Sequence, residues 1–133
     1  MRIVVIAAPA HRKGIPAYVT ALAKGMEAMG HRVDILDAWT GDPYRVPAYE
    51  YVVVATEAVS LFGGVMPEAL RRILSSGGLV GKKSAAFLKK TGPFPGKAMA
   101  NLMRDMEKEG MYINWSDIIV SSTPVEELGK RIG

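Results

Sequence analysis

The chain alternates short apolar runs with segments in which apolar residues recur every three or four positions. Residues 2–7 and 51–56 are rich in β-branched residues and show almost no polar alternation, which is typical of strands covered on both faces of a sheet. Shorter runs predict three further strands, at residues 33–36, at residues 84–88 and within residues 111–120. We therefore expect five strands, with residues 2–7 as a central one.

Helical spacing appears between these strands. The first predicted helix begins near Pro16, which suits a first turn, and ends at Gly30 as its C-cap. Its expected buried face consists of Tyr18, Leu22, Gly25, Met26 and Met29. Two more helices are predicted from Met66, Leu70, Ile73 and Leu74 behind Pro67, and from Met99, Leu102, Met103 and Met106 before Gly110.

Two segments depart from this regular order. Residues 37–50 are polar and contain Gly41, Pro43 and Pro47, so we expect a shortened or missing helix there. Near the C-terminus, residues 123–126 read Thr-Pro-Val-Glu, which matches a capping box with proline at the first helical position. A short last helix is therefore predicted, with an apolar stripe of Val125, Leu128 and Ile132.

Strands that alternate with helices pair in parallel through right-handed crossovers. The sequence therefore predicts one α/β domain over residues 1–133, a three-layer α/β/α sandwich around a five-stranded parallel sheet. We expect the strand order 2-1-3-4-5, which reverses between the first and third strands and opens a crevice at their carboxyl ends. Any ligand is expected in that crevice.

Composition narrows the possible functions. The 133 residues are 49% hydrophobic and carry a net charge of +4 without a polybasic block, so anionic ligands are favoured weakly and nucleic acid very weakly. There is no cysteine, which excludes disulfides, thiolate metal sites and cysteine nucleophiles. The apolar run at the start is too short for a signal peptide, and no run is long enough to cross a bilayer. We therefore expect a soluble, cytoplasmic protein without membrane attachment.

Three loops meet at the expected crevice, and the first is the most basic. Residues 9–14 read Pro-Ala-His-Arg-Lys-Gly and lead into a helix, where free backbone N–H groups and the helix dipole favour an anion such as phosphate. Arg12 and Lys13 add positive charge there. The alternative is that this geometry is common to all such loops and that the basic triplet is only solvated.

The other two loops each carry an aromatic residue. Residues 60–64 place Phe62 beside Gly63 and Gly64, which allow a flat ligand to approach the backbone closely. Residues 90–96 place Phe94 between two prolines, and it could face Phe62 across the crevice. The alternatives are that Phe62 packs on the following helix and that Phe94 seals the edge of the core.

These residues resemble the flavodoxin-like superfamily, which includes flavodoxins and NADPH-dependent FMN and quinone reductases. The best stretch is residues 51–74, where strand, loop, Phe62-Gly63-Gly64-Val65 and Pro67 are similar to the reductases' T-P-x-Y-x-G-x-x-P segment. The resemblance implies FMN as cofactor, with its phosphate in the first loop and its ring between the other two. It carries the cofactor-binding role onto Ala10, His11, Arg12, Lys13, Gly14, Ile15, Ser60, Leu61, Phe62, Gly63, Gly64, Lys90, Thr91, Gly92 and Phe94.

The first loop departs from the family pattern. Ala8, Ala10 and Ile15 stand where the family has hydroxyl side chains, so phosphate would be held by backbone N–H groups with Arg12 or Lys13. Two hypotheses follow. The first is an FMN-binding protein that carries electrons to a redox partner protein or, as an FMN-dependent oxidoreductase, reduces a small acceptor. The second is a flavin-free domain that binds another anionic ligand or a protein partner.

Other chemistry finds little support. His11 and His31 lie on different loops without ligand-spaced partners, and Ser60 lacks the G-x-S-x-G elbow of nucleophilic hydrolases. Basic residues are interleaved with acidic ones such as Asp105, Glu107 and Glu109, which disfavours nucleic-acid binding.

Overall fold

The computed structural model of the chain describes residues 1–59 and 64–132. It contains, in order, β1 (Arg2–Ala8), α1 (Ala17–Ala28), β2 (Arg32–Asp37), the 3₁₀ helix η1 (Pro43–Ala48), β3 (Tyr51–Thr56), α2 (Glu68–Leu74), β4 (Lys83–Lys89), α3 (Pro95–Lys108), β5 (Tyr112–Ile119) and α4 (Val125–Gly129). The predicted strands and helices are all confirmed, and η1 is the shortened helix expected between β2 and β3.

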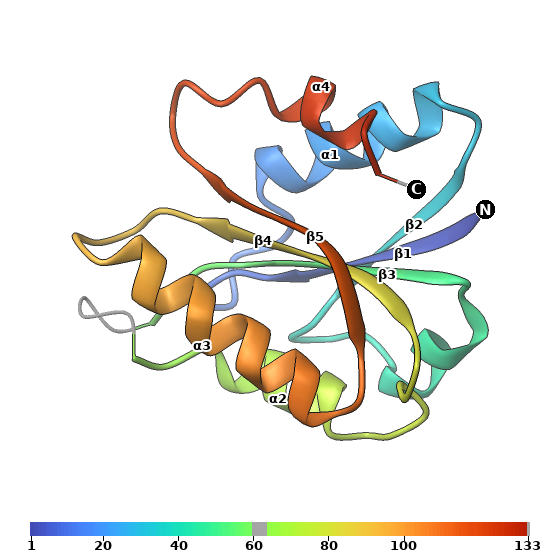
Figure 1. Cartoon of the computed structure of the whole chain (residues 1–133), viewed down its shortest axis with the longest axis horizontal. Coiled ribbons are helices and arrows are strands. Elements are labelled where there is room, and N and C mark those ends of the chain that lie inside the picture. The colour runs from blue at the N-terminus through green and yellow to red at the C-terminus, as the bar shows by residue number, and fades with distance from the viewer. Residues whose placement is uncertain (60–63, 133) are drawn as a thin grey trace.

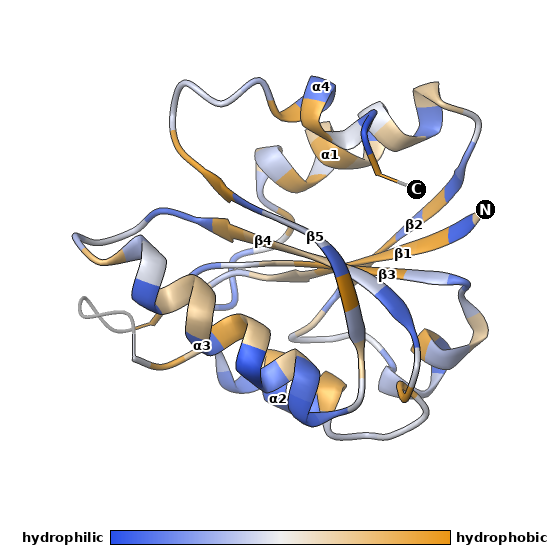
Figure 2. Cartoon of the chain, in the orientation of Figure 1, coloured by the Kyte–Doolittle hydropathy of each residue, from blue (hydrophilic) through white to orange (hydrophobic). Residues whose placement is uncertain are grey.

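The five strands form one parallel sheet of order β2-β1-β3-β4-β5, as predicted. Figure 1 shows α1 and α4 on one face of the sheet and α2 and α3 on the other. The central strands are therefore covered twice, and every residue of β3 is buried. Figure 2 shows apolar residues concentrated in the strands, while α3 also carries strongly hydrophilic residues.

The two faces of the sheet bury separate cores. One core packs Val4, Ile6 and Val52 against α2 and α3, and the other packs Ile3, Val5 and Val53 against α1 and α4. Alternate residues of one strand thus feed opposite cores, as a strand covered on both faces requires.

α1 and α4 lie against each other at two glycines. A Cβ atom on Gly25 would lie 2.0 Å from the carbonyl oxygen of Glu126, and one on Gly129 would lie 2.3 Å from that of Leu22. Only glycine permits backbones to approach so closely. This contact holds α4, and with it the loop from β5 to α4, against the N-terminal half of the domain.

Two local predictions are wrong. Met29 is 57% exposed, because it is the C-cap residue of α1 and lies beyond the helical periodicity. The capping box at residues 123–126 is absent, because the Thr123 Oγ1 accepts the Val120 N–H at 2.9 Å and α4 has no side-chain cap. Thr123 instead closes a turn after β5.

Candidate functional site

The first loop, residues 9–16, runs from the end of β1 to the start of α1 and is anchored by neighbouring strands. The Trp39 Nε1–H donates to the Pro9 carbonyl at 2.9 Å, and the Thr56 hydroxyl donates to the Ala8 carbonyl at 2.7 Å. Parallel pairing aligns Ala8 with Thr56, so the residue after Thr56 lies beside the residues after Ala8. That residue is Glu57.

Glu57 places its carboxylate on the donors of the first loop. Its Oε1 accepts the Ala10 N–H at 2.9 Å and the Lys13 ammonium at 2.9 Å. Glu57 is 3% exposed, whereas the Lys13 side chain is 51% exposed. The first loop therefore holds an oxyanion of the protein itself, and the predicted binding of an outside phosphate there stays a prediction.

The surroundings keep Glu57 ionised. Burial by itself would raise the pKa of Glu57, but the Ala10 N–H, the Lys13 ammonium and the positive charge of Lys89 outweigh it, so the pKa lies below its ordinary value. At neutral pH the position thus holds a full negative charge.

The remaining predicted residues of the first loop surround this contact without entering it. His11, Arg12, Gly14 and Ile15 are all exposed. Gly14 has φ +80° and open space where a Cβ would be, so it serves backbone conformation alone. Of the predicted cofactor residues in this loop, Ala10 and Lys13 are the two that bind the Glu57 carboxylate.

The second loop falls mostly outside the described residues. This applies to Ser60, Leu61, Phe62 and Gly63, so their predicted contacts with a ring stay predictions. Gly64 is described and exposed. The residues on either side of this loop are joined by a hydrogen bond of 2.9 Å, which the Val59 N–H donates to the Val65 carbonyl.

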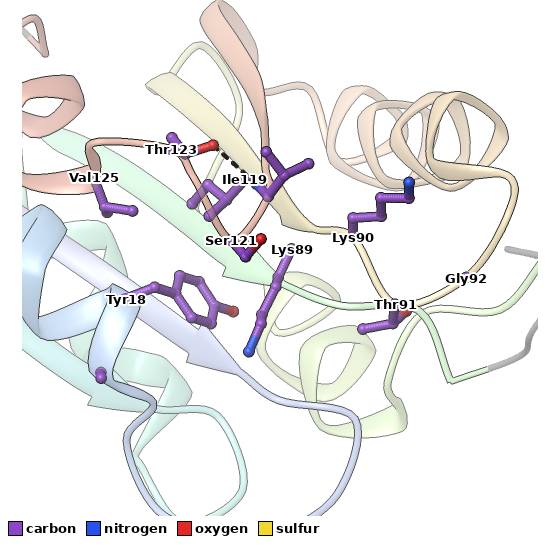
Figure 3. Close-up of a pocket in the computed structure, with 11 residues that line it drawn as sticks. Tyr18, Lys89, Lys90, Thr91, Gly92, Ile119, Ser121, Thr123 and Val125 are labelled. Atoms are coloured by element: carbon purple, nitrogen blue, oxygen red, sulfur yellow. Dashed lines mark hydrogen bonds between the residues drawn. The ribbon is translucent and has the colours of Figure 1, made fainter.

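A cleft of about 720 Å³ opens at the carboxyl ends of β4 and β5 (Figure 3). We call it the lysine cleft. Its polar lining comes from α1, from the third loop and from the loop after β5, and consists of Tyr18, Lys89, Lys90, Thr91, Ser121 and Thr123. Ile119, Val120 and Val125 supply apolar surface, and Ala17 and Gly92 complete the lining. The cleft lies to one side of the predicted crevice between β1 and β3.

Tyr18 and Lys89 form the inner wall of the lysine cleft. Figure 3 shows the two side chains next to each other, with the Lys89 ammonium 5.6 Å from the centre of the Tyr18 ring. Tyr18 is 9% exposed, and its hydroxyl has no hydrogen-bond partner among the described residues. Burial first, and then the negative charge of Glu57, raise the pKa of Tyr18. Its hydroxyl is therefore a buried neutral donor.

Sequence reasoning found part of this lining and missed the rest. Lys90, Thr91 and Gly92 were expected at the site, and they line the cleft, whereas Phe94 is 50% exposed and lies at the start of α3. Helical spacing predicts Tyr18 on the core face of a helix, and no pattern in the sequence marks the loop after β5 as part of a site. The predicted strand order could have indicated this loop. Because β5 lies beside β4, the loops that follow these two strands must lie side by side.

No group of metal-ligating side chains gathers anywhere in residues 1–59 or 64–132. Within the same ranges no helix has the length and apolar character needed to cross a membrane.

The fold of this chain is similar to that of several solved flavodoxin structures. No protein-family model and no curated protein matches the sequence. Among solved structures, a flavodoxin from the domain Archaea has a TM-score of 0.72 at 17% identity, covering 98% of this chain and 92% of that one. The two-electron reduced flavodoxin of Megasphaera elsdenii has a TM-score of 0.72 at 16% identity, with 98% and 96% coverage.

A flavodoxin described as WrbA-like, from Agrobacterium tumefaciens, is more distant, with a TM-score of 0.64 at 13% identity over 98% of this chain and 93% of that one. These structures have nearly the same extent as this chain and superpose on almost all of it. The chain therefore has the flavodoxin-like fold.

Proposed function

We propose that this chain is a flavin-free flavodoxin-like domain that binds an anionic small molecule other than FMN at the carboxyl edge of its sheet. One observation carries the proposal: the donors of the first loop, the Ala10 N–H and the Lys13 ammonium, already hold the buried carboxylate of Glu57. An FMN phosphate in that loop would lie beside this carboxylate, with the exposed Arg12 guanidinium and the remaining backbone N–H groups as its donors.

Electrostatics argues against an FMN phosphate beside this carboxylate. Like charges about 4 Å apart repel by roughly 4 kcal/mol for each pair of unit charges at an effective dielectric constant of about 20, and a phosphate monoester is close to a dianion. The Thr56 hydroxyl offers no compensation, because it donates to the Ala8 carbonyl. The carboxylate of Glu57 therefore disfavours an FMN phosphate in the first loop while it keeps its two bonds.

The second candidate is the function that the resemblance implies, an FMN-binding protein that carries electrons or reduces a small acceptor. Two observations favour it: the fold is that of flavodoxins, and Ala10 and Lys13 converge on one oxyanion. For this function Glu57 would have to leave both donors, and residues 60–64 together with Lys90, Thr91, Gly92 and Phe94 would hold the ring.

A fluorescence titration with FMN distinguishes the two candidates. We expect the wild-type protein to give no saturable quenching of FMN fluorescence up to about 1 mM. Glu57→Ser removes the charge and adds a hydroxyl, so it should bind FMN at least about tenfold more tightly than the wild type. Glu107→Gln, which removes an exposed carboxylate of α3, should behave as the wild type.

Riboflavin, which lacks the phosphate, is the matched ligand control. The higher affinity of the Glu57→Ser protein should appear with FMN and not with riboflavin. A wild-type protein that purifies yellow and binds FMN tightly would overturn the proposal in favour of the electron carrier. A Glu57→Ser protein with no gain would contradict the assignment of the first loop as an oxyanion site.

A further inference from the structure

The lysine cleft holds positive charge without a matching carboxylate. Lys89 and Lys90 are both exposed, and neither forms an ion pair with any described residue, since the two ion pairs found in the described ranges are those of Lys13 and Lys130. Glu57 acts electrostatically on Lys89 and Tyr18, but its carboxylate is bound to Lys13. A ligand in the cleft therefore meets two ammonium groups.

The cleft also holds a hydroxyl donor that the protein leaves unused. Tyr18 is more than nine-tenths buried and lines the cleft, and its oxygen has no partner among the described residues. Buried polar groups in native proteins are nearly always hydrogen-bonded, and an exception calls for a partner such as a ligand. The Tyr18 oxygen itself is covered in the free protein, so an acceptor atom of a ligand reaches this donor when the side chain turns toward the cleft.

The mouth of the cleft adds the Thr123 hydroxyl as a further donor and is held in shape by hydrogen bonds of the backbone. The Lys90 N–H continues the sheet by donating to the Ile119 carbonyl at 2.9 Å. The Thr123 hydroxyl accepts the Val120 N–H and retains its own O–H for donation. Because both loops are tied to adjacent strands, these groups are held in place before any ligand arrives.

The size and apolar lining of the cleft define the rest of the ligand. A cleft of about 720 Å³ falls within the range of small-molecule sites. The ring of Tyr18 and the side chains of Ile119 and Val125 provide apolar surface beside the cations. This combination suits a molecule with one strongly anionic end and a flat, mostly apolar body.

We infer that the lysine cleft is a binding site for a phosphate monoester with an aromatic body, of the class of nucleoside monophosphates. Two lysines match the charge of a dianionic phosphate, which lysine binds as a point charge. The Tyr18 hydroxyl and the hydroxyls of the mouth donate hydrogen bonds to acceptor atoms of the ligand. The inference names the ligand class and the position for the proposed anion-binding function, and so rests on it.

Backbone-amide NMR of the full chain tests this assignment. Titration with AMP should shift the amides of residues 89–92 and 121–123 saturably, and inorganic phosphate should shift the same amides with weaker affinity. Adenosine, which lacks the phosphate, should bind at least about tenfold more weakly than AMP. The inference is overturned if AMP and inorganic phosphate both leave these amides unchanged up to about 10 mM.

Variants separate the roles of the lining residues. Lys89→Gln with Lys90→Gln should weaken AMP binding at least about tenfold, whereas Lys24→Gln, an exposed lysine of α1 outside the cleft, should leave it unchanged. Tyr18→Phe should weaken AMP binding about threefold to tenfold without lowering the melting temperature of the free protein. Equal affinity in the double variant and in Lys24→Gln would contradict the assignment.

The position of the shifted amides separates failure of this inference from failure of the proposed function. If wild type binds no FMN and the cleft amides respond to neither AMP nor inorganic phosphate, the flavin-free domain stands and the lysine cleft is not its phosphate site. If AMP or FMN instead shifts the amides of residues 10–14, the ligand enters the first loop, and both the inference and the proposed function fail.

Discussion

The first loop and the lysine cleft lie at the same edge of one sheet but differ in whether their polar groups are hydrogen-bonded within the protein. In the first loop the Ala10 N–H and the Lys13 ammonium bind Glu57, and the Pro9 carbonyl binds Trp39. In the cleft the Tyr18 hydroxyl has no partner in the described structure. The two donors that converge in the first loop thus already hold an anion, whereas the buried donor of the cleft does not.

This difference also explains why the shared fold does not decide the function. Parallel α/β sheets place binding loops at the carboxyl ends of the strands, but a single residue such as Glu57 determines whether one of those loops accepts an outside anion. Discrimination of this kind works by placing an unfavourable charge against the unwanted ligand.

The largest predicted effect comes from the contact between α1 and α4, where one substitution should disturb the lysine cleft and leave the first loop unchanged. Gly25→Ala should lower the free energy of unfolding by about 3 kcal/mol, because the new methyl group would lie 2.0 Å from the Glu126 carbonyl oxygen. Pushing α4 away also displaces the loop after β5, so the amides of residues 121–125 should shift while those of residues 9–13 remain. Denaturant unfolding and amide NMR measure the two effects.

Gly14→Ala is the matched control for that variant. Gly14 also has a conformational role, with φ +80°, but open space surrounds its would-be Cβ, so the cost should be about 1 kcal/mol. A Gly25→Ala protein that loses no more stability than Gly14→Ala would show that the helix contact does not hold the cleft wall.

Glu57 provides a smaller effect that is specific to the first loop. Because the folded pKa of Glu57 is depressed below its ordinary value of 4.5, its stabilisation is present above that pH and is lost as the pH falls through the folded pKa. Glu57→Gln should therefore lower the free energy of unfolding by about 2 kcal/mol at pH 7.

That difference should shrink as the pH falls below 4.5, and unfolding curves at several pH values measure it. Glu107→Gln should change stability little at any pH, because its carboxylate is exposed. A loss in Glu57→Gln that stays constant into acid would mean that shape, not charge, holds the first loop.

The layered fold could be predicted because apolar runs and helical spacing report burial directly. The same patterns could not reveal the partner of Glu57, since Glu57 and Ala10 are 47 residues apart and meet only through the register of β1 and β3. The prediction that the first loop binds an outside anion stays a prediction, and the carboxylate that its donors do hold could be found only from tertiary structure.

Tyr18 illustrates a second limit. Its spacing with Leu22 and Met26 predicted a buried position, which is confirmed. Periodicity places a side chain on a face, however, and does not tell whether a hydroxyl at its tip finds a partner. The predicted capping role of Thr123 is wrong for a related reason. Its hydroxyl closes a local turn by accepting the Val120 N–H and does not cap the helix.

The smallest predicted effect tests most directly whether the Tyr18 hydroxyl lacks a partner in the free protein. Removing a hydroxyl from a buried tyrosine usually lowers stability, and here it should not. Tyr18→Phe removes a buried hydroxyl that has no described partner, so the free protein should keep its stability or gain up to about 1 kcal/mol. Tyr49→Phe removes a hydroxyl that donates to the Asp34 carboxylate at 2.6 Å, so it should lose about 1 kcal/mol. Thermal unfolding of both variants without ligand compares two tyrosines that differ in whether the protein itself satisfies them. If Tyr18→Phe loses as much stability as Tyr49→Phe, the Tyr18 hydroxyl is already bonded in the free protein and is not reserved for a ligand.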